Sequence, residues 1–402
     1  MIVIGAGIGG LLVATLLQKK HDLTIFERGA VGGRFRNLPY KGFQLSTGAF
    51  HALPHGSTGP AAEILKKTHT PHKIVDAKRW GTFLVNGEEH TFNDLNSFLS
   101  FMKRLRVSKV LFDMRFRGGD KTPLGEYIDD KFGNEIVNKA VKAFCGFSMS
   151  VDPDDITTET FFPIVESLYR YGGSGVIVGG CSGITDRVAE GKNIIKKRIK
   201  EIVIEENRVK GVVDSEDNFY EDSTVISDIG VKKTIEIVGK KNFPKEYLKA
   251  AGKLQEANGI KINIASKESI LDHKGVLLTC DTERVEGLNQ VTNVDPSLAP
   301  EGYHLIMTHQ TLRSNNVKKE IDRGLVDIEK IFGDKKYEIL LVQTFRNGFP
   351  VNRAVNGQDF DCRTPIKGLY LVGDSVKKET MEVDGIAKGI LELYEELSSI
   401  RE

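Results

Sequence analysis

The segment GAGIGG, residues 5–10, holds four glycines, and the carboxylate of Glu27 follows it along the chain. Glycine has no Cβ, so such a run lets the backbone turn tightly and approach another group closely. Where the run opens a helix, its free N–H groups converge on one spot and bind an anion such as phosphate. A carboxylate placed like Glu27 accepts both hydroxyls of a ribose and repels a 2′-phosphate. These residues therefore predict a dinucleotide site that disfavours NADP.

The flanking residues supply the elements that such a site needs. Residues 2–4 are expected to form a buried strand, residues 11–20 a helix, and residues 23–26 a second strand that ends at Glu27. This is a βαβ unit, in which one glycine permits the turn, one admits the pyrophosphate and one packs the helix on the strand. NAD and FAD both fit this unit.

Composition describes a globular chain without a strong overall charge. The 402 residues are 40% hydrophobic and 28% charged, and 56 Lys and Arg against 55 Asp and Glu give a net charge of +1. No global field therefore points to nucleic acid. The four cysteines lie far apart, so we expect no metal site and a reducing, cytoplasmic location. The first twenty residues lack the basic leader of a signal peptide and are too glycine-rich and short for a membrane span.

Three further motifs distinguish between NAD and FAD. A double glycine and an arginine occupy residues 32–34, GFQLSTGAFH spans residues 42–51, and GLYLVGDSV spans residues 368–376. In this order the motifs resemble the phytoene desaturase and flavin amine oxidase superfamily of FAD enzymes, which has the two-domain organisation of the glutathione reductase fold class. The resemblance runs over the whole chain and is specific at its two ends and near residues 173–230.

The resemblance implies FAD-binding roles for individual residues. Gly32, Gly33 and Arg34 would line the diphosphate, and Asp374 would hold the ribityl chain. Arg34 is a permanent cation whose planar fork suits phosphate. The segment around Asp384 resembles the turn that starts the last helix beneath the flavin, where a helix N-terminus stabilises the reduced anion; Asp384 also suits the N-cap of that helix. The expected FAD-binding residues are Gly5, Gly7, Ile8, Gly9, Gly10, Glu27, Arg28, Gly32, Gly33, Arg34, Ile199, Gly373, Asp374, Val383, Gly385 and Ile386.

Two long insertions separate the segments that resemble an FAD-binding domain. We expect an α/β domain of the Rossmann-like glutathione reductase class, formed by residues 1–75, 180–240 and 355–402. An inserted, discontinuous α+β substrate domain would comprise residues 76–179 and 241–354.

Local patterns predict the contents of the insertions. Asn86-Gly87 between apolar stretches is a hairpin signal, and helical stretches follow it. GIKINIAS, GVLLTC and YHLIMTHQTL are typical of antiparallel strands, residues 317–331 of an amphipathic helix, and residues 337–345 of a strand. Residues 193–213 predict a strand, a turn and a second strand.

No clear catalytic acid or base can be identified. His51 and His55 follow the segment that contacts flavin in the superfamily, and Arg346, with Gln343, precedes the last FAD segment, so these residues are candidates by position alone. The resemblance implies an FAD-dependent oxidoreductase that dehydrogenates or isomerises a small hydrophobic, isoprenoid or carotenoid-like substrate at flavin N5. This substrate class rests on the resemblance.

Two alternatives and one surface question stay open. An amine oxidase or protoporphyrinogen oxidase-like enzyme would show an aromatic pair at the flavin, and Trp80 is the only tryptophan. A non-catalytic prenyl-binding protein of the GDP-dissociation-inhibitor type shares the fold but loses much of the flavin site. Residues 101–117 interleave basic and apolar side chains, which suits peripheral contact with an anionic membrane, although a packed domain helix with a solvated charged face is favoured. The sequence sets no oligomeric state.

Overall fold

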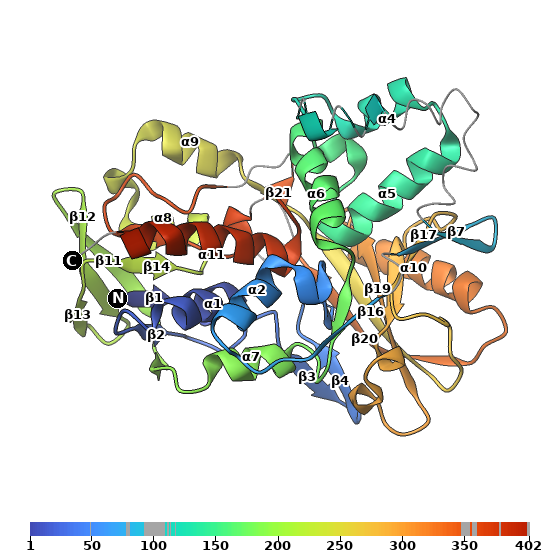
Figure 1. The fold of residues 1–402 in the computed structure, drawn as a ribbon, viewed down its shortest axis with the longest axis horizontal. Coiled ribbons are helices and arrows are strands. Elements are labelled where there is room, and N and C mark those ends of the chain that lie inside the picture. Colours follow the sequence, from blue (N-terminus) through green and yellow to red (C-terminus); the bar gives the residue numbers. More distant parts are fainter. Residues whose placement is uncertain are drawn as a thin grey trace.

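The computed structural model divides into two halves, each built around one large sheet (Figure 1). The half that contains α1 and α11 holds a parallel sheet, and the other half holds a larger sheet that α5 and α10 contact. The structure describes residues 1–48, 50–77, 81–91, 109–110, 112, 114–116, 118–346, 354–355, 360–377 and 379–399.

The parallel sheet has the strand order β10-β2-β1-β14-β22. Its strands are apolar and buried because layers cover both faces. In register, Ile4 pairs with Phe26 and with Ser227, and Ser227 pairs with Leu371. The residues that follow these four therefore lie in a row along one edge. The strands are β1 (Ile2–Ile4), β2 (Thr24–Phe26), β10 (Ile194–Ile195), β14 (Val225–Ser227) and β22 (Leu369–Leu371).

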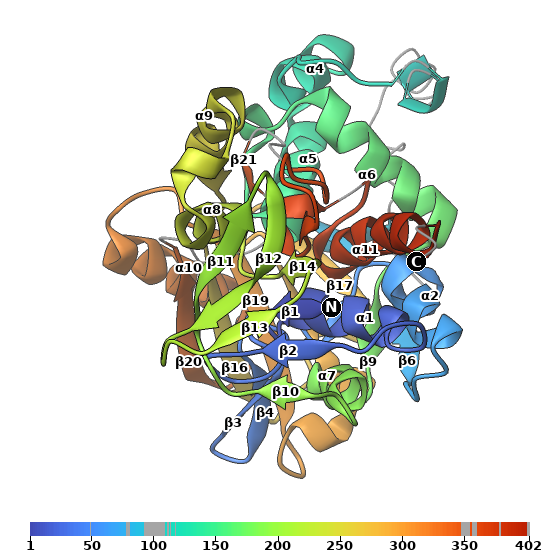
Figure 2. The same ribbon diagram turned by 90° about the vertical axis from the view of Figure 1, so that its left-hand side faces the viewer.

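Helices lie on one side of the parallel strands and an antiparallel sheet on the other (Figure 2). α1, α2 and α11 pack against one another, α7 contacts α1, and α8 contacts both β11 and α9. The helices are α1 (Ile8–Leu17), α2 (Pro60–Lys67), α7 (Ser182–Ala189), α8 (Val231–Val238), α9 (Lys245–Lys253) and α11 (Glu382–Ser399). The antiparallel sheet consists of β11 (Ile199–Glu205), β12 (Arg208–Asp214) and β13 (Phe219–Glu221).

A seven-stranded sheet of order β20-β16-β19-β18-β17-β7-β8 brings the two long insertions together. Neighbouring strands are antiparallel, except that β17 pairs with β7 in parallel. That parallel pair joins the first insertion to the second. The strands are β7 (Thr82–Val85), β8 (Glu88–Thr91), β16 (Gly259–Ser266), β17 (Val276–Thr279), β18 (Gly287–Gln290), β19 (His304–Thr311) and β20 (Tyr337–Phe345).

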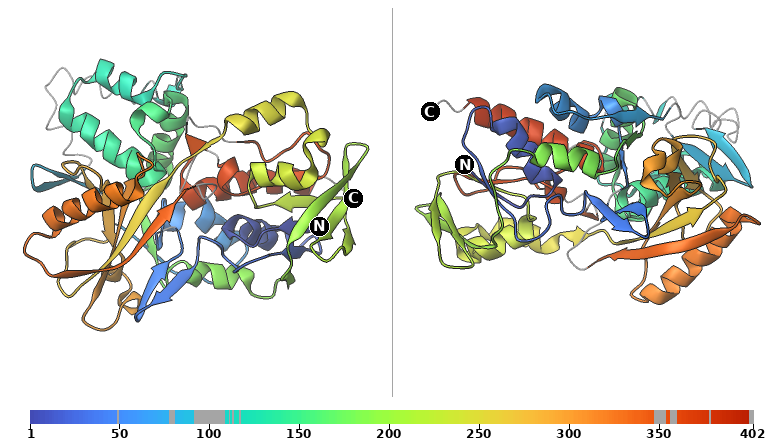
Figure 3. Two further views of the ribbon diagram at one scale, coloured as in Figure 1. Left: turned by 180° about the vertical axis from the view of Figure 1, so that it is seen from behind. Right: turned by 90° about the horizontal axis from the view of Figure 1, so that it is seen from below.

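Side chains alternate between the two sides of this sheet, and a different helix packs on each side. Ile260, Ile262 and Ile264 of β16 pack with the apolar face of α10, which lies on the side away from the other half (Figure 3). α5 contacts β17, β18 and β19, and it packs with α4 and α6. The remaining elements are α4 (Leu124–Lys131), α5 (Glu135–Met149), α6 (Thr158–Tyr171), α10 (Val317–Phe332), β3 (Asn37–Tyr40), β4 (Phe43–Ser46), β5 (Ala52–Leu53), β6 (Ile74–Asp76), β9 (Gly175–Ile177), β15 (Gln255–Glu256) and β21 (Ala354–Val355).

Most local predictions are confirmed, with one shift in a helix boundary. The mixed α/β fold class, the hairpin at Asn86-Gly87, where both residues have positive φ (53° and 78°), and the amphipathic helix α10 agree with the structure. The first helix, expected over residues 11–20, occupies Ile8–Leu17 instead. It begins directly after Gly7 because the glycines at positions 9 and 10 form its first turn rather than a loop before it.

The basic segment 101–117 lies mostly outside the described residues, as does Trp80. Of its described members, Val110 is buried, whereas the rings of Phe112 and Phe116 are 51% and 68% exposed and lie 4.8 Å apart. Contact of this segment with a membrane stays a prediction. Among the helices that the structure describes, none has the length and hydropathy to cross a bilayer.

Asp384 joins α11 to the start of α2, rather than capping its own helix as expected. Its fully buried carboxylate accepts the N–H of Ala61 and the N–H of His55, both at 2.9 Å. α2 begins after Gly59, which offers no capping side chain, and a Cβ on Gly59 would lie 2.6 Å from Asp384 Oδ1. Asp384 therefore caps α2 from another helix.

We predict that Asp384→Ala destabilises the fold. It leaves two buried N–H groups without an acceptor, at a cost of about 1–3 kcal/mol each. Urea unfolding measures the loss, and Asp384→Asn, which keeps one amide oxygen, should lose less. Equal unfolding free energies for the wild type and Asp384→Ala would contradict the role of Asp384 as the cap.

Candidate functional site

The glycine segment lies at the carboxyl edge of the parallel sheet, between β1 and α1. The N–H of Gly5 donates to Phe26 O at 2.8 Å, and Gly5 has a φ of 101°, in the region that favours glycine. A Cβ on Gly10 would overlap the carbonyl oxygen of Gly5. Glycine at position 10 therefore lets α1 pack closely on β1, as the spacing predicted, and the helix N-terminus opens onto the sheet edge.

Glu27 follows β2 and links two loops at this edge. Its Oε2 accepts the N–H of Ala6 at 2.7 Å, and its Oε1 accepts the N–H of Gly29 at 2.5 Å. The carboxylate lies beside the glycine segment, where the sequence places it. Its neighbour Arg28 is exposed to solvent.

The double glycine carries Arg34 over the same edge. Gly32 and Gly33 both have positive φ, 88° and 53°, and the N–H of Gly32 donates to Ala6 O at 2.7 Å. The Arg34 guanidinium forms an ion pair with the carboxylate of Asp374, 340 positions away. Burial lowers the pKa of Arg34, while the nearby carboxylates of Asp228 and Glu256 raise it. Two motifs far apart in the chain thus meet in one charged cluster.

Lys377 is a second cation of this cluster, which sequence reasoning missed. Its side chain is fully buried, and its Nζ lies 2.7 Å from Asp374 Oδ1. Asp374 is therefore held between Arg34 and Lys377. The motif GDSVKK shows this lysine three positions after the aspartate, directly after the short helical turn of residues 374–376.

The other expected FAD-binding residues lie in the hydrophobic core or in the first turn of α11. Ile199 starts β11 and is buried in the core of this half, as are Val383 and Ile386 in the first turn of α11. The N–H of Gly385 donates to Met381 O at 2.9 Å, and a Cβ there would lie 3.0 Å from the Lys377 side chain.

The two candidate histidines are buried and use every ring nitrogen within the protein. His51 Nδ1 accepts the N–H of Cys181 at 3.0 Å, and its Nε2 lies 2.8 Å from Gln44 O. Burial lowers the pKa of His51 to about 4, so the ring is neutral at pH 7. These contacts favour a structural role over the catalytic one expected.

His55 and Arg346 are also poorly placed for chemistry. The Nδ1 of His55 lies 2.9 Å from Gly172 O, and its Nε2 contacts the hydroxyls of Ser167 and Thr380. Arg346 is exposed at the end of β20. Gln343, three residues earlier on β20, donates its side-chain N–H to Ser46 O at 3.1 Å.

An apolar cavity lies where the start of α11 meets the seven-stranded sheet and α5. It contains about 680 Å³ of space that no atom fills, part of it open to solvent. Among the described residues that line it, Glu382 is the one titratable side chain. Burial raises the pKa of Glu382 to about 7, and Asp384 adds to that rise while Lys377 opposes it. Its other lining residues include Phe50, Phe144, Phe147, Leu278, Met381 and Asn289.

Lys261 is a buried lysine that was not among the site residues predicted from the sequence. It lies on β16, on the side opposite the isoleucines, and its Nζ donates to Ser46 O, Ser46 Oγ and Gly48 O at 2.9, 2.6 and 3.1 Å. Burial lowers its pKa to about 7. It thus holds part of the 42–51 segment. A lysine between isoleucines in GIKINIAS was the signal that could have identified it.

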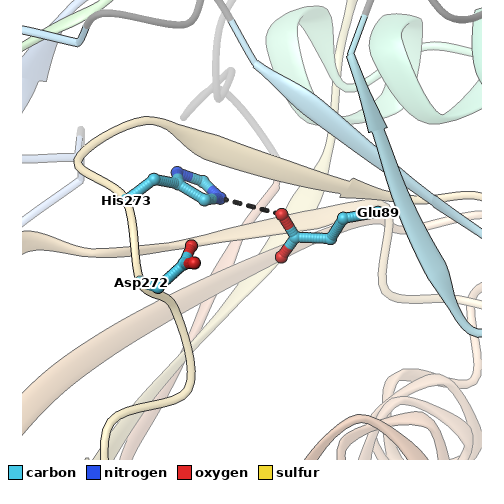
Figure 4. A group of neighbouring side chains, drawn as sticks. All are labelled: Glu89, Asp272 and His273. Carbon is cyan, nitrogen blue, oxygen red and sulfur yellow. Dashed lines mark ion pairs between the residues drawn. The ribbon is translucent and has the colours of Figure 1, made fainter.

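Glu89, Asp272 and His273 converge at the β7–β8 hairpin and have the side-chain types of a metal site (Figure 4). His273 Nδ1 accepts the N–H of Gly275 at 3.1 Å, so the neutral ring carries its proton on Nε2, which faces Glu89 at 3.6 Å. Neither nitrogen then has a free lone pair. We assign the group to tethering of the hairpin rather than to metal binding.

We predict a pH-dependent contribution of Lys261 to stability. An unfolded lysine titrates near pH 10.4, and burial lowers the folded pKa to about 7. Between these values the unfolded chain binds more protons, so wild-type stability should rise with pH by up to about 1.4 kcal/mol per unit relative to Lys261→Met. Below about pH 7 the difference should be constant.

Urea unfolding at about pH 6 and about pH 9 measures this difference. Lys335→Met, at an exposed lysine that donates to Ser269 O, is the control and should follow the wild-type profile. Parallel profiles for the wild type and Lys261→Met would contradict the buried, shifted lysine.

Comparison with known proteins agrees with this arrangement. Residues 3–68 match the model of the NAD(P)-binding Rossmann-like domain. The chain is 42% identical to an uncharacterized protein of Methanocaldococcus jannaschii, over 99% of both chains. It is 27% identical to prolycopene isomerase 1, chloroplastic, of an Oncidium hybrid cultivar, over 93% of this chain and 79% of that protein.

Solved structures extend the similarity. An oxidoreductase from Methanosarcina mazei has a TM-score of 0.92 and 39% identity, over 98% of this chain and 99% of that one. Putrescine oxidase shares the fold, with a TM-score of 0.77 at 14% identity over 99% and 98% of the two chains. The chain therefore belongs to the phytoene desaturase and flavin amine oxidase superfamily of oxidoreductases, which has a Rossmann-like dinucleotide-binding domain.

Proposed function

We propose that this protein is an FAD-dependent oxidoreductase that removes hydride from, or isomerises, a hydrophobic isoprenoid or carotenoid-like substrate. The observation that carries the proposal is the apolar cavity at the start of α11, whose described lining residues include a single carboxyl group. The similarity to prolycopene isomerase supports the same substrate class.

The sheet edge fits a dinucleotide. The loop at residues 5–10 has the glycines that close backbone approach requires, and α1 directs its free N–H groups at the edge. Arg34 would pair with the diphosphate, and Glu27 would accept ribose hydroxyls, which favours FAD over a 2′-phosphorylated cofactor. When bound, FAD supplies the hydride-accepting chemistry.

The cavity favours a hydrocarbon over a polar substrate. Phe50 and Phe147 place their rings 5.0 Å apart in its lining. Such rings stabilise an apolar chain by dispersion and by excluding water. An amine oxidase-like function would need a more polar lining than these residues provide. A prenyl-binding protein without redox chemistry would not require the cluster of Glu27, Arg34 and Asp374.

Glu382 would serve as the acid or base of this cavity. Removing a hydride from one carbon leaves a cation, and a neutral alkene forms when a neighbouring carbon loses a proton to a carboxylate. Because its pKa is raised to about 7, Glu382 is partly ionised at neutral pH and suits both the acceptance and the return of a proton. Isomerisation would use the same group in both directions.

We predict that Glu27→Ala weakens FAD binding. Each charge-assisted hydrogen bond to a ribose hydroxyl contributes about 1.5–3 kcal/mol, so Kd should rise by roughly tenfold to more than a hundredfold. Flavin absorbance of the purified protein and FAD titration of the apoprotein measure this, with Glu27→Gln as the intermediate case. Unchanged flavin retention in a folded Glu27→Ala protein would refute the assignment.

We predict that Glu382→Gln retains flavin but loses turnover. General acid–base groups contribute about 10²–10⁴-fold to rate, and the wild-type rate should rise with pH through about 7 as the carboxyl group ionises. Anaerobic flavin reduction by isoprenoid substrates measures both. Ser148→Ala, in the same cavity, should keep the wild-type pH profile; an identical pH profile in Glu382→Gln would exclude Glu382 as the base.

A further inference from the structure

Asp228, one of the carboxylates near Arg34, points into the centre of the dinucleotide loop. It directly follows β14, and its N–H donates to Ile4 O at 2.8 Å, which fixes it beside the end of β1. A Cβ on Gly9 would lie 2.6 Å from Asp228 Oδ1, and a Cβ on Gly7 or Gly373 would come closer still to one of its oxygens. Three glycines from two motifs therefore leave the space that this carboxyl group fills.

The carboxyl group lies against the glycine loop at the N-terminus of α1, the place where a phosphate would bind. The backbone N–H groups of Gly7 and Gly10 lie near this carboxyl group and favour its ionised form. α1 has no acidic residue in its first turn and no capping side chain of its own. Asp228 thus supplies the negative charge that the positive end of this helix attracts. A diphosphate is drawn to the same place by the same groups.

The charges around Asp228 make a second anion unfavourable. Glu27 faces it from the end of β2, and Arg34 faces it from the 32–34 loop. On the β22 side, Asp374 already pairs with Arg34 and with Lys377. The glycine loop and the start of α1 face it with uncharged backbone. Together with Glu256, which also acts on Arg34, four carboxylates and two cations thus share the edge before a diphosphate adds its own two negative charges.

Burial also disfavours the ionised form of Asp228. It raises the pKa of Asp228 to about 7, and Glu27 adds to the rise, whereas the two backbone N–H groups and Arg34 oppose it. Some of its surface still faces solvent. A carboxyl group that titrates near neutral pH can therefore change its state when a ligand arrives.

We propose that Asp228 is a proton-linked ligand of the dinucleotide diphosphate. In the free protein the carboxylate lies against the glycine loop; in the complex the carboxylic acid donates its O–H to a phosphate oxygen. Binding then takes one proton from solvent, and no bond to phosphorus forms or breaks. The inference rests on the proposed function for the identity of the ligand as FAD.

The linkage fixes the sign of the pH dependence. The complex holds a proton that the free protein loses above about pH 7. Affinity should therefore be constant below that pH, and Kd should rise by up to about tenfold per pH unit above it. A purely structural cap would give no such slope, because its protonation would be the same with and without ligand.

FAD titration of the apoprotein, followed by flavin fluorescence from about pH 5.5 to about pH 8.5, tests the inference. Wild-type Kd should rise above neutral pH, whereas Asp228→Asn, of the same shape but uncharged, should change by less than about twofold and bind more tightly than wild type at the alkaline end. Calorimetry near pH 8 in buffers of different ionisation enthalpy should give uptake of about one proton for the wild type and none for the variant.

The outcomes separate this inference from the cofactor assignment. Equal pH slopes in wild type and Asp228→Asn, or no proton uptake by wild type near pH 8, would overturn the role of Asp228 while leaving FAD binding intact. If Asp228→Asn does not fold, proton uptake by the wild type decides alone. Failure of the folded wild type to bind FAD even at about pH 5.5 would refute the proposed cofactor and the inference together.

Discussion

The register of the parallel sheet is the constraint on which the site depends. Because the ends of β1, β2, β14 and β22 lie in one row, the residues that follow them share one edge. Glu27 and Asp228 are two of these residues, and Asp374 comes shortly after the last strand. A one-residue slip in any strand would send its side chains to the other face. The glycine loop acts only because the sheet brings these charges to it.

Three buried ionisable groups of the site lower the stability of the folded protein. Asp228, Lys261 and Glu382 each have a pKa shifted towards neutrality by burial. Each shift reports that the charged form is disfavoured in the folded protein. Apolar residues of the same size would avoid that cost. For Asp228 and Glu382 the proposed chemistry accounts for that cost, whereas Lys261 holds the 42–51 segment through its three hydrogen bonds.

Local order could be predicted from the sequence, whereas long-range contacts could not. The βαβ unit, the Asn86-Gly87 hairpin and α10 follow from periodicity and turn residues a few positions apart. The cap that Asp384 gives to Ala61 spans 323 positions, and the parallel pairing of β17 with β7 also joins distant segments. The order of residues along the chain contains no signal for the cap or for the strand pairing, because each joins residues that are far apart in the sequence. The same limit applies to His51, whose buried contacts come from other elements.

The segment from Asp374 to Asp384 connects the dinucleotide edge to the apolar cavity. Asp374 contacts Arg34 at the edge, and Glu382 lines the cavity. Lys377 lies between them, since it pairs with Asp374 and also opposes the rise in the pKa of Glu382. A diphosphate that draws Arg34 away from Asp374 leaves Lys377 as the main partner of that carboxylate. The positive charge of Lys377 would then be offset more fully by Asp374 and would favour the ionised form of Glu382 less. Cofactor binding would therefore raise the pKa of Glu382 and shift this group of the cavity towards its protonated form.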